Sequence, residues 1–488
     1  MPTTPVWSQL PPLAGLCSFA DAQRAGLSVE ECVTWMKRHH YLLVRLHQIF
    51  TARITAEPVY ELKTAFSLHS YLCAEHASAF RQRVSELREP PLGLEVVPHP
   101  ALQLLCDEVL AAPSHVELTL GLYQVILPAL MDSLKQYLET TNPLSDAPSV
   151  RITRFCLFEL EQVLSFGRQA VACLVDAQSL HKLESWQGLL KECLARAGGI
   201  SGHDGLDEAP TVGTSAGNQV CDDSSVAVMN PQFSALPYQY DPVPKRDARF
   251  QDSFNAGVNP EAFLYDERFA ARDKSVMMFY KRLREIDVPE MMASILVQTP
   301  GKPWKYYRDM SRQLWDEARH AMLGEVGFVH LGIDWTQIPV NFTWSRNLNT
   351  QLKPWERHAV LFFIEQGLMP RTGKRYEWEV GLASGVPLAG LFQDFDWADE
   401  VLHAQIGREW YVKEFGDLNE AMSYGDRCWS QVLSHWRGYR DEGLTEHRNW
   451  WPDVYRAACA HWGVTPDPVA LAFDTTYETT RADLQEIG

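Results

Sequence analysis

The sequence lacks the features that mark secreted and membrane-spanning chains. No apolar run approaches the about 20 residues that a membrane-spanning helix needs, and residues 1–16 contain no basic segment followed by an apolar one, so we predict no signal peptide. The ten cysteines form no C-x-x-C pair and are scattered through apolar segments, which favours reduced, buried thiols. We therefore expect a cytoplasmic protein without a membrane partner.

The chain also has fewer basic than acidic residues. The chain has 44 Lys and Arg against 62 Asp and Glu, which gives a net charge of −18 at pH 7. Nucleic acids and anionic membranes are bound through basic surfaces, so we expect neither as a main partner. The 46% hydrophobic content across 488 residues is enough for about two or three domains with sizeable cores.

Strand signals are sparse, and we predict an all-α protein. Residues 1–197 read as a helical domain without a metal motif; Ser28 and Glu31 form a capping box at the start of its first long helix. Residues 198–241 are rich in Gly, Ser, Asp and Pro, which predicts a flexible linker. The rest divides into a helical bundle over 242–416 and a helical extension over 417–488 that packs on it. Within the bundle we expect helices over 273–299, 302–329 and 354–369, a further helical stretch that ends near 416, and a loop over 330–350.

The helical domain over 1–197 leaves two alternatives open. Its acidic residues fall on successive predicted helices, as in a bundle that once held metal, and these are Glu61, Glu117, Glu159 and Glu161. The domain would then be a metal-free relative of the C-terminal half. The other alternative is an unrelated helical domain with solvated carboxylates.

Only two Glu-x-x-His motifs occur in the chain, and both lie in one longer repeat. The pattern D-E-x-x-H-A-x-x-G is found at residues 316–324 and 399–407. A Glu and a His three residues apart lie one turn apart on one face of a helix, and the small Ala and Gly leave room for helices to approach. Two such helices facing each other would bring two carboxylates and two imidazoles together, as in a two-metal site of a helical bundle. The alternative is two amphipathic helices with solvated pairs. The residues concerned are Glu317 with His320 and Glu400 with His403.

Such a site needs one more carboxylate from each of two other helices. Before Glu400, the candidate is Glu365, which lies between Ile364 and Leu368 on an apolar helical stripe. A buried carboxylate needs a partner, and a cation would supply one. The alternative for Glu365 is an exposed side chain in an unusual position.

Before Glu317, three carboxylates are candidates: Glu285, Asp287 and Glu290. We favour Glu290, because it continues an apolar stripe, whereas Glu285 shares its side with Lys281 and Arg282, which indicates a solvated face. The stripe consists of Phe279, Leu283, Ile286, Glu290, Ala293 and Val297. The alternative is that residues 287–290 form a capping box that restarts a helix, with Glu290 only in its first turn.

The aspartates that precede the two glutamates predict a second layer of contacts. A metal-bound histidine usually donates its other ring N–H to a carboxylate. We expect Asp316 to orient His403 and Asp399 to orient His320 across the helix pair, with Arg319 joining the network. The alternative is that these carboxylates are solvated.

These residues resemble the ferritin-like di-iron carboxylate superfamily, over about residues 273–416. Its catalytic members include bacterial multicomponent monooxygenases, the ribonucleotide reductase small subunit, acyl-carrier desaturases and N-oxygenases. The resemblance implies a ferritin-like four-helix bundle with a Glu, a Glu-x-x-His, a second Glu and a second Glu-x-x-His as metal ligands. Carried onto this chain, the ligands are Glu290, Glu317, His320, Glu365, Glu400 and His403.

The resemblance further implies a non-haem di-iron oxidoreductase. It would use two Fe ions, with Mn/Fe or Mn as alternatives, and O₂ as co-substrate to hydroxylate, N-oxygenate or desaturate a small organic molecule. No flavin or nicotinamide motif occurs, so we expect either an external electron donor or a substrate oxidation that supplies its own electrons. A homodimer is left open. The alternative is a non-catalytic metal-binding or protein-interaction helical protein.

Overall fold

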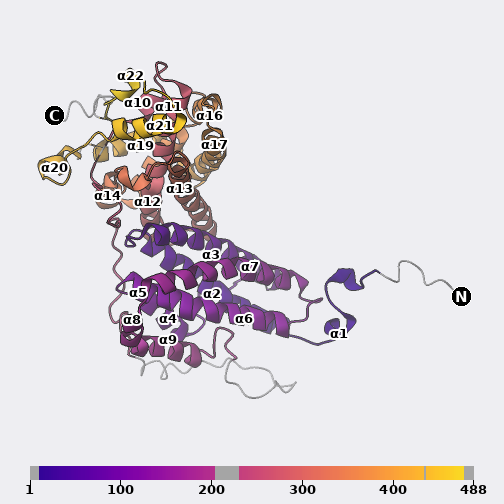
Figure 1. Ribbon diagram of the computed structural model, residues 1–488. Coiled ribbons are helices and arrows are strands. Elements are labelled where there is room, and N and C mark those ends of the chain that lie inside the picture. Colours follow the sequence, from indigo (N-terminus) through magenta and orange to yellow (C-terminus); the bar gives the residue numbers. More distant parts are fainter. Residues whose placement is uncertain (1–9, 89, 204–229, 256, 434–435, 478–488) are drawn as a thin grey trace. The chain divides into compact units, whose positions relative to one another are not determined.

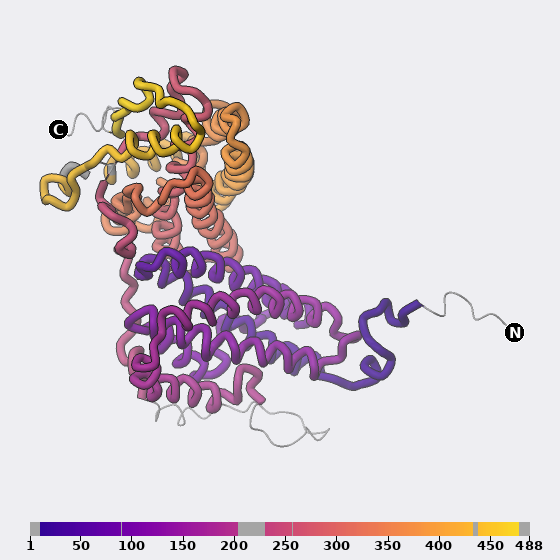
Figure 2. Tube along the Cα trace, in the orientation of Figure 1, coloured from indigo at the N-terminus to yellow at the C-terminus, as the bar shows by residue number. Residues whose placement is uncertain are grey.

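The computed structural model describes residues 10–88, 90–203, 230–255, 257–433 and 436–477 (Figure 1). Over these residues the chain forms helices and no strand (Figure 2). The prediction of an all-α protein is confirmed. Most of the predicted flexible linker, residues 204–229, lies outside the described residues.

Two compact units make up the chain. The N-terminal unit comprises Met1–Ile49 and Leu72–Gln239, and the C-terminal unit comprises Phe50–Tyr71 and Tyr240–Gly488. The change of unit near Gln239 falls within the predicted 198–241 boundary. The assignment of residues 50–71 to the C-terminal unit was not predicted, because the helical pattern there runs on without a break in composition.

Four long helices dominate the first half of the chain, namely α2 (Val29–Arg53), α3 (Tyr60–Leu87), α6 (Leu127–Thr140) and α7 (Ala147–Leu174). In the N-terminal unit α2 contacts α6 through a 2.8 Å hydrogen bond between His39 and Ser133, and α3 contacts α7 through a 2.9 Å bond from Arg83 to Ser149. The predicted capping box is present, because the Ser28 N–H donates to Glu31 Oε2 (2.7 Å) and the Glu31 N–H to Ser28 Oγ (3.3 Å). The shorter elements are η2 (Leu13–Gly15), α1 (Phe19–Ala22), α4 (Pro100–Leu110), α5 (His115–Leu120), the π-helix η3 (Gly121–Ile126), α8 (Ala177–Lys182) and α9 (Glu184–Arg196).

Helix α2 buries three histidines in the N-terminal unit. Burial lowers the pKa of His39 to about 3 and those of His40 and His47 to about 4, whereas an unfolded histidine has a pKa near 6.5. Between pH 6.5 and about 4 the unfolded chain therefore binds more protons than the folded chain. Lowering the pH through this window lowers the free energy of unfolding.

We expect each of these histidines to contribute on the order of 1 kcal/mol of lost stability per pH unit in that window. Urea unfolding at pH 7.0, 6.0 and 5.0 measures the slope. His39→Gln should make it shallower, because glutamine does not titrate. The matched control is His181→Gln on α8, where the side chain is 82% exposed. An unchanged slope in His39→Gln would contradict the prediction.

The second half of the chain contains the remaining helices. Those that matter below are α11 (Ala271–Leu283), the 3₁₀ turn η5 (Arg284–Ile286), α12 (Asp287–Val297), α13 (Trp304–His330), α15 (Pro354–Gly367), α16 (Lys374–Ala383) and α17 (Pro387–Gly407). The others are α10 (Pro260–Leu264), η6 (Trp335–Gln337), α14 (Thr343–Gln351), the π-helix η7 (Arg408–Val412), α18 (Lys413–Phe415), α19 (Leu418–Leu433), α20 (Trp436–Asp441), α21 (Trp451–Trp462) and α22 (Pro468–Leu471).

The helix predicted over 273–299 is interrupted. It consists of α11, η5 and α12, and Pro289 lies in the first turn of α12, where its missing N–H leaves no hydrogen bond unmade. From Asp273 to Leu283 every residue of α11 is buried. Part of the predicted loop over 330–350 is helical, because α14 begins at Thr343.

Helices α11, α13, α15 and α17 form the frame of the C-terminal unit. Contacts join α11 to α13, α12 to α13 and α15, and α13 and α15 to α17. Two helices that follow residue 416 pack on this frame, since α19 contacts α15 and α21 contacts α11. Trp450 and Trp451 are buried in the same apolar core as Phe279 of α11.

The glycine that ends each copy of the repeat lies at a close helix contact. A Cβ on Gly324 would lie 2.2 Å from the backbone N of Leu283 on α11, and a Cβ on Gly407 would lie 2.3 Å from the Phe362 ring on α15. The small residues therefore let α13 approach α11 and let α17 approach α15, as the repeat predicted.

Gly324→Ala should be strongly destabilising. The atoms that a methyl group would meet belong to the backbone of α11, which cannot rotate away, so we expect a loss of about 3 kcal/mol in the free energy of unfolding, measured by urea unfolding. The control is Gly367→Ala at the end of α15, where a Cβ meets no atom within 4 Å. A loss of similar size in both variants would contradict this explanation.

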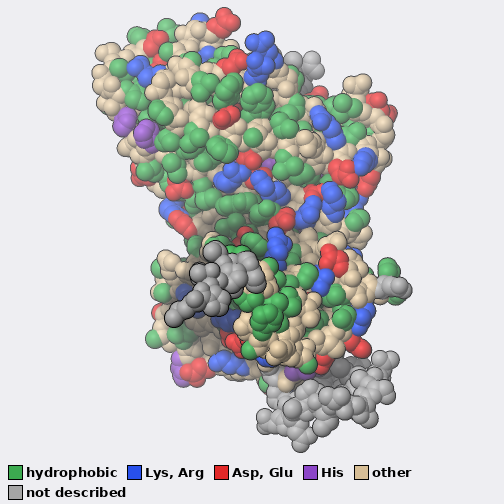
Figure 3. Space-filling model, turned by 90° about the vertical axis from the view of Figure 1, so that its right-hand side faces the viewer, with side chains coloured by type: hydrophobic (Ala, Val, Ile, Leu, Met, Phe, Trp, Pro, Cys, Tyr) green, Lys and Arg blue, Asp and Glu red, His purple; other side chains and the backbone are tan. Residues whose placement is uncertain are grey.

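Acidic and basic side chains are interspersed on the face of the molecule that Figure 3 presents. Among the described helices, none combines the length and the apolar character that crossing a membrane requires.

Candidate metal centre

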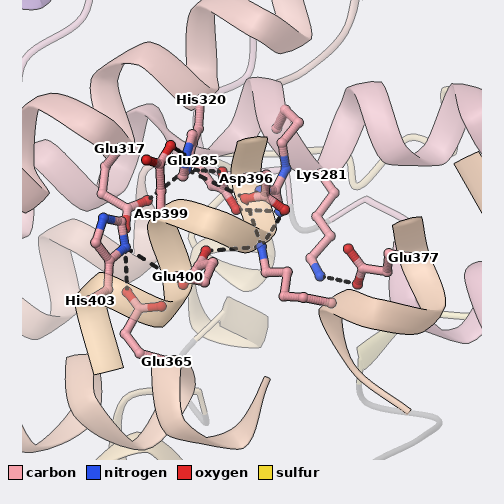
Figure 4. Close-up of polar contacts among 12 residues, drawn as sticks. Lys281, Glu285, Glu317, His320, Glu365, Glu377, Asp396, Asp399, Glu400 and His403 are labelled. Atoms are coloured by element: carbon pink, nitrogen blue, oxygen red, sulfur yellow. Dashed lines mark hydrogen bonds and ion pairs between the residues drawn. The ribbon is translucent and has the colours of Figure 1, made fainter. Parts of the chain in front are cut away.

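Four elements of the C-terminal unit bring carboxylates and imidazoles together (Figure 4). They are η5, α13, α15 and α17. Among the described residues, two groups have potential ligand atoms that all lie within 4.8 Å of one another. Site A consists of Glu317, Glu365, Glu400 and His403, and site B consists of Glu285, His320 and Asp396.

In site A the ligand atoms surround His403 Nδ1. This atom lies 3.1 Å from Glu317 Oε1, 3.6 Å from Glu400 Oε2 and 3.9 Å from Glu365 Oε1. Gln313 Nε2 donates a 3.1 Å hydrogen bond to Glu365 Oε1 and holds that carboxyl in place. Site A thus combines three carboxyl groups and one imidazole from three helices.

In site B the corresponding atom is His320 Nδ1. It lies 3.5 Å from Glu285 Oε2, 3.6 Å from Asp396 Oδ1 and 3.7 Å from Glu317 Oε2. Glu317 therefore directs one oxygen toward each imidazole, so it could be a ligand in both sites.

Both histidines present their other ring nitrogen to an aspartate on the opposite helix. His320 Nε2 lies 3.1 Å from Asp399 Oδ2, and His403 Nε2 lies 3.4 Å from Asp316 Oδ2. Arg319 Nη2 donates to both aspartates, at 2.7 and 2.6 Å. These are the crossed contacts that the repeat predicted. An aspartate that accepts the Nε2 proton leaves the Nδ1 lone pair free for a cation.

Five potential ligand atoms of the cluster are buried and make no hydrogen bond with any described residue. They are Glu285 Oε2, Glu317 Oε1, Glu400 Oε2, His320 Nδ1 and His403 Nδ1. Leaving such atoms unpaired costs free energy. All five belong to site A or site B, so one or two bound cations would satisfy them together, and the donor set of oxygen and imidazole fits iron or manganese.

The electrostatics of the cluster also favour a cation. Burial and the neighbouring Glu400 and Glu317 raise the pKa of Glu365 well above its usual value. Burial acts to lower the pKa of His320, but the neighbouring carboxylates, first Asp399, raise it to about 10. The pKa of His403 is raised well above its usual value against the effect of burial, first by Asp316. Positive charge is stabilised throughout the cluster.

Two buried cationic side chains lie beside the carboxylates, and the sequence did not point to either. Lys374 Nζ at the start of α16 lies 2.8 Å from Asp396 Oδ2 and 2.9 Å from Glu400 Oε1. Arg282 on α11 pairs with Glu285 at 2.8 Å and also with Asp396. Against the effect of burial, Lys374 lowers the pKa of Glu400 well below its usual value, and Arg282 lowers that of Glu285 to about 2.

Glu290 is not brought to the cluster. Its fully buried carboxylate accepts hydrogen bonds from Lys63 Nζ, from Arg246 Nε and Nη2 at 3.1 Å each, and from Ser345 Oγ at 2.8 Å. Burial raises its pKa, but Arg246 and Lys63 lower it to about 2. Our preference for Glu290 over Glu285 is therefore corrected, because it is Glu285 that faces His320.

Asp396 was also missed, although a signal was present. It precedes Glu400 by four residues and so lies on the same face of α17, one turn earlier. Arg282 gave no such signal, because a charged residue in a helix usually indicates a solvated face. Here that face is buried.

A cavity of about 310 Å³ lies near the N-termini of α13 and α15. Tyr306, Trp355, His358 and Trp410 are among its lining residues. His358 precedes Glu365 by seven residues, which is about 10 Å along a helix. The cavity is therefore separated from site A by about two turns of α15.

Comparisons of the chain with family models, with curated proteins and with solved structures find no match.

Proposed function

We propose that this protein is a ferritin-like di-metal oxidoreductase that uses O₂ to oxidise a small organic molecule. The proposal is supported mainly by one observation, the unpaired buried ligand atoms of sites A and B between two crossed Asp–His pairs. Five unpaired buried ligand atoms gathered in two adjoining groups favour a bound cation.

The first metal ion would be held by site A and the second by site B, with Glu317 between them. Oxygen and imidazole ligands suit iron or manganese. Two bound iron ions would supply the O₂ activation and the redox chemistry. The organic substrate and the electron donor would come from outside the chain, since its sequence carries no flavin or nicotinamide motif.

The protein's own residues have separate tasks in this proposal. Asp316 and Asp399 hold the protons on the Nε2 atoms and fix the ring orientations, so that both Nδ1 atoms face the carboxylates. Arg319 balances the charge of the two aspartates. Burial of Glu317 and Glu400, each 2% exposed, excludes bulk water from the cluster.

Metal analysis of protein purified from cells supplied with iron or manganese tests the proposal. We expect bound Fe or Mn in the wild type, and O₂ consumption when the metal-loaded protein is reduced. The comparison is His320→Ala combined with His403→Ala, which should lose the metal while circular dichroism shows retained helices. A folded wild type that takes up neither metal would overturn the proposal. Metal uptake without O₂ consumption would favour a non-catalytic metal protein.

A further inference from the structure

Sites A and B differ in how many of their carboxylate oxygens already pair with a lysine or an arginine. Glu317 offers one oxygen to each imidazole. Glu400 is its counterpart in the repeat, but only its Oε2 faces His403, because its Oε1 accepts from Lys374. Of the two repeat glutamates, only Glu317 therefore offers an oxygen to both imidazoles.

Both carboxylates of site B have cationic partners. Glu285 pairs with Arg282, and Asp396 pairs with Arg282 and with Lys374. The Arg282 and Lys374 side chains are each 1% exposed, so these charges are held inside the protein, where an arginine stays protonated. Two carboxylates in site B thus face two positive charges.

Site A has the opposite balance. Among the described lysines and arginines, Lys374 alone forms an ion pair with these three carboxyl groups, and it does so with Glu400, on the oxygen that turns away from His403. Glu365 is hydrogen-bonded by the neutral side chain of Gln313. A cation that enters site A meets carboxyl groups whose one lysine contact is on the far oxygen of Glu400, whereas a cation that enters site B meets an arginine and a lysine paired with both of its carboxylates.

We propose that the centre fills in order, with the first divalent metal ion bound tightly in site A and the second excluded from site B until Arg282 moves aside. This inference rests on the proposed metal binding. The repulsion of a divalent ion by buried charges a few ångströms away predicts that the second ion binds at least about 100-fold more weakly than the first. Arg282 and Lys374 are then positioning residues that set metal occupancy.

The test is an anaerobic titration of the metal-free full chain with Mn²⁺. Calorimetry measures the heat of binding, and the electron paramagnetic resonance signal measures the free Mn²⁺. In the wild type we expect one tight ion per chain and a second at least about 100-fold weaker. Arg282→Gln and Lys374→Gln each remove one charge beside site B. Arg282→Gln should bring the second affinity to within about tenfold of the first, and Lys374→Gln, which leaves Arg282 in place, should bring it only part of the way.

The control is Arg375→Gln, which removes the same charge one residue after Lys374, where the side chain is 46% exposed and pairs with Glu379. It should leave both affinities unchanged. Two equally tight ions in the wild type would overturn ordered filling and leave the proposed metal site intact. A second affinity that stays weak in every folded variant would overturn the role of the two cations. No Mn²⁺ or Fe²⁺ uptake by the folded wild type would instead overturn the proposed function. The wild-type titration decides the order of filling even if a variant does not fold.

Discussion

Replacing Glu317 by glutamine should reduce the metal content of the purified protein to less than about one-tenth of the wild-type value. Glu317 lies within 3.7 Å of His320 Nδ1 and 3.1 Å of His403 Nδ1, so its loss removes a ligand from both sites. Removing a negative ligand typically weakens a metal site far more than the 10- to 100-fold cost of losing an outer partner. Metal analysis after gel filtration measures the loss.

The glutamine side chain keeps the volume of the glutamate, and the fold should therefore survive this substitution. Circular dichroism and the urea midpoint check that it does. Glu325→Gln is the matched control, because it makes the same change two turns later on α13 and outside both sites. Equal metal contents in Glu317→Gln and the wild type would remove Glu317 from the ligand set.

Replacing Glu290 by alanine should have the opposite pattern, with a large loss of stability and little loss of metal. The substitution leaves the ammonium of Lys63 and the guanidinium of Arg246 buried without their carboxylate partner. Breaking a buried ion pair on one side costs about 3–5 kcal/mol. Urea unfolding measures the free-energy change, and metal analysis of the folded fraction measures occupancy.

Glu267→Ala is the control for this second prediction, because Glu267 is exposed in the same unit and should change stability by less than about 0.5 kcal/mol. If Glu290→Ala lost the metal and kept its stability, Glu290 would return to the ligand set. The two predictions together distinguish Glu317, which is proposed to bind a metal ion, from Glu290, whose charge is neutralised by Lys63 and Arg246 of the same chain.

The repeat could be interpreted from sequence because its information is local. A spacing of three residues fixes Glu317 and His320 on one face of any helix, and the Asp before each Glu follows from the same geometry. The crossed contacts of Asp316 and Asp399 needed only the further assumption that α13 and α17 face each other. The structure contains both contacts.

The first-helix carboxylate could not be chosen in this way, for two physical reasons. A prediction from an apolar stripe assumes that the opposite face of the helix is exposed to solvent. From Asp273 to Leu283, however, every residue of α11 is buried, including Lys281 and Arg282. Such a prediction also assumes a constant 3.6 residues per turn. The 3₁₀ turn η5 breaks that period between Glu285, which it contains, and Glu290, which follows it on α12. Apolar stripes therefore pointed to the carboxylate that has its own ion pairs.

The ion-pair partners of Glu290 and Asp396 could not be predicted either, because they come from distant segments of the chain. Glu290 is neutralised by Lys63, which is 227 residues earlier in the chain, and Asp396 is bound by Lys374 from a separate helix. No periodicity within one helix encodes such pairings. The assignment of the ferritin-like fold itself remains a prediction from the resemblance.

The membership of residues 50–71 in the C-terminal unit has a consequence for biosynthesis. A ribosome adds about 5–20 residues per second, so Lys63 is made roughly 10–45 s before Glu290, its partner 227 residues later. During that time the lysine remains hydrated, because its burial without a carboxylate would be costly. The C-terminal unit thus cannot be completed until the chain has been made as far as Glu290. A gene fragment that begins at residue 240 would encode that unit without Lys63.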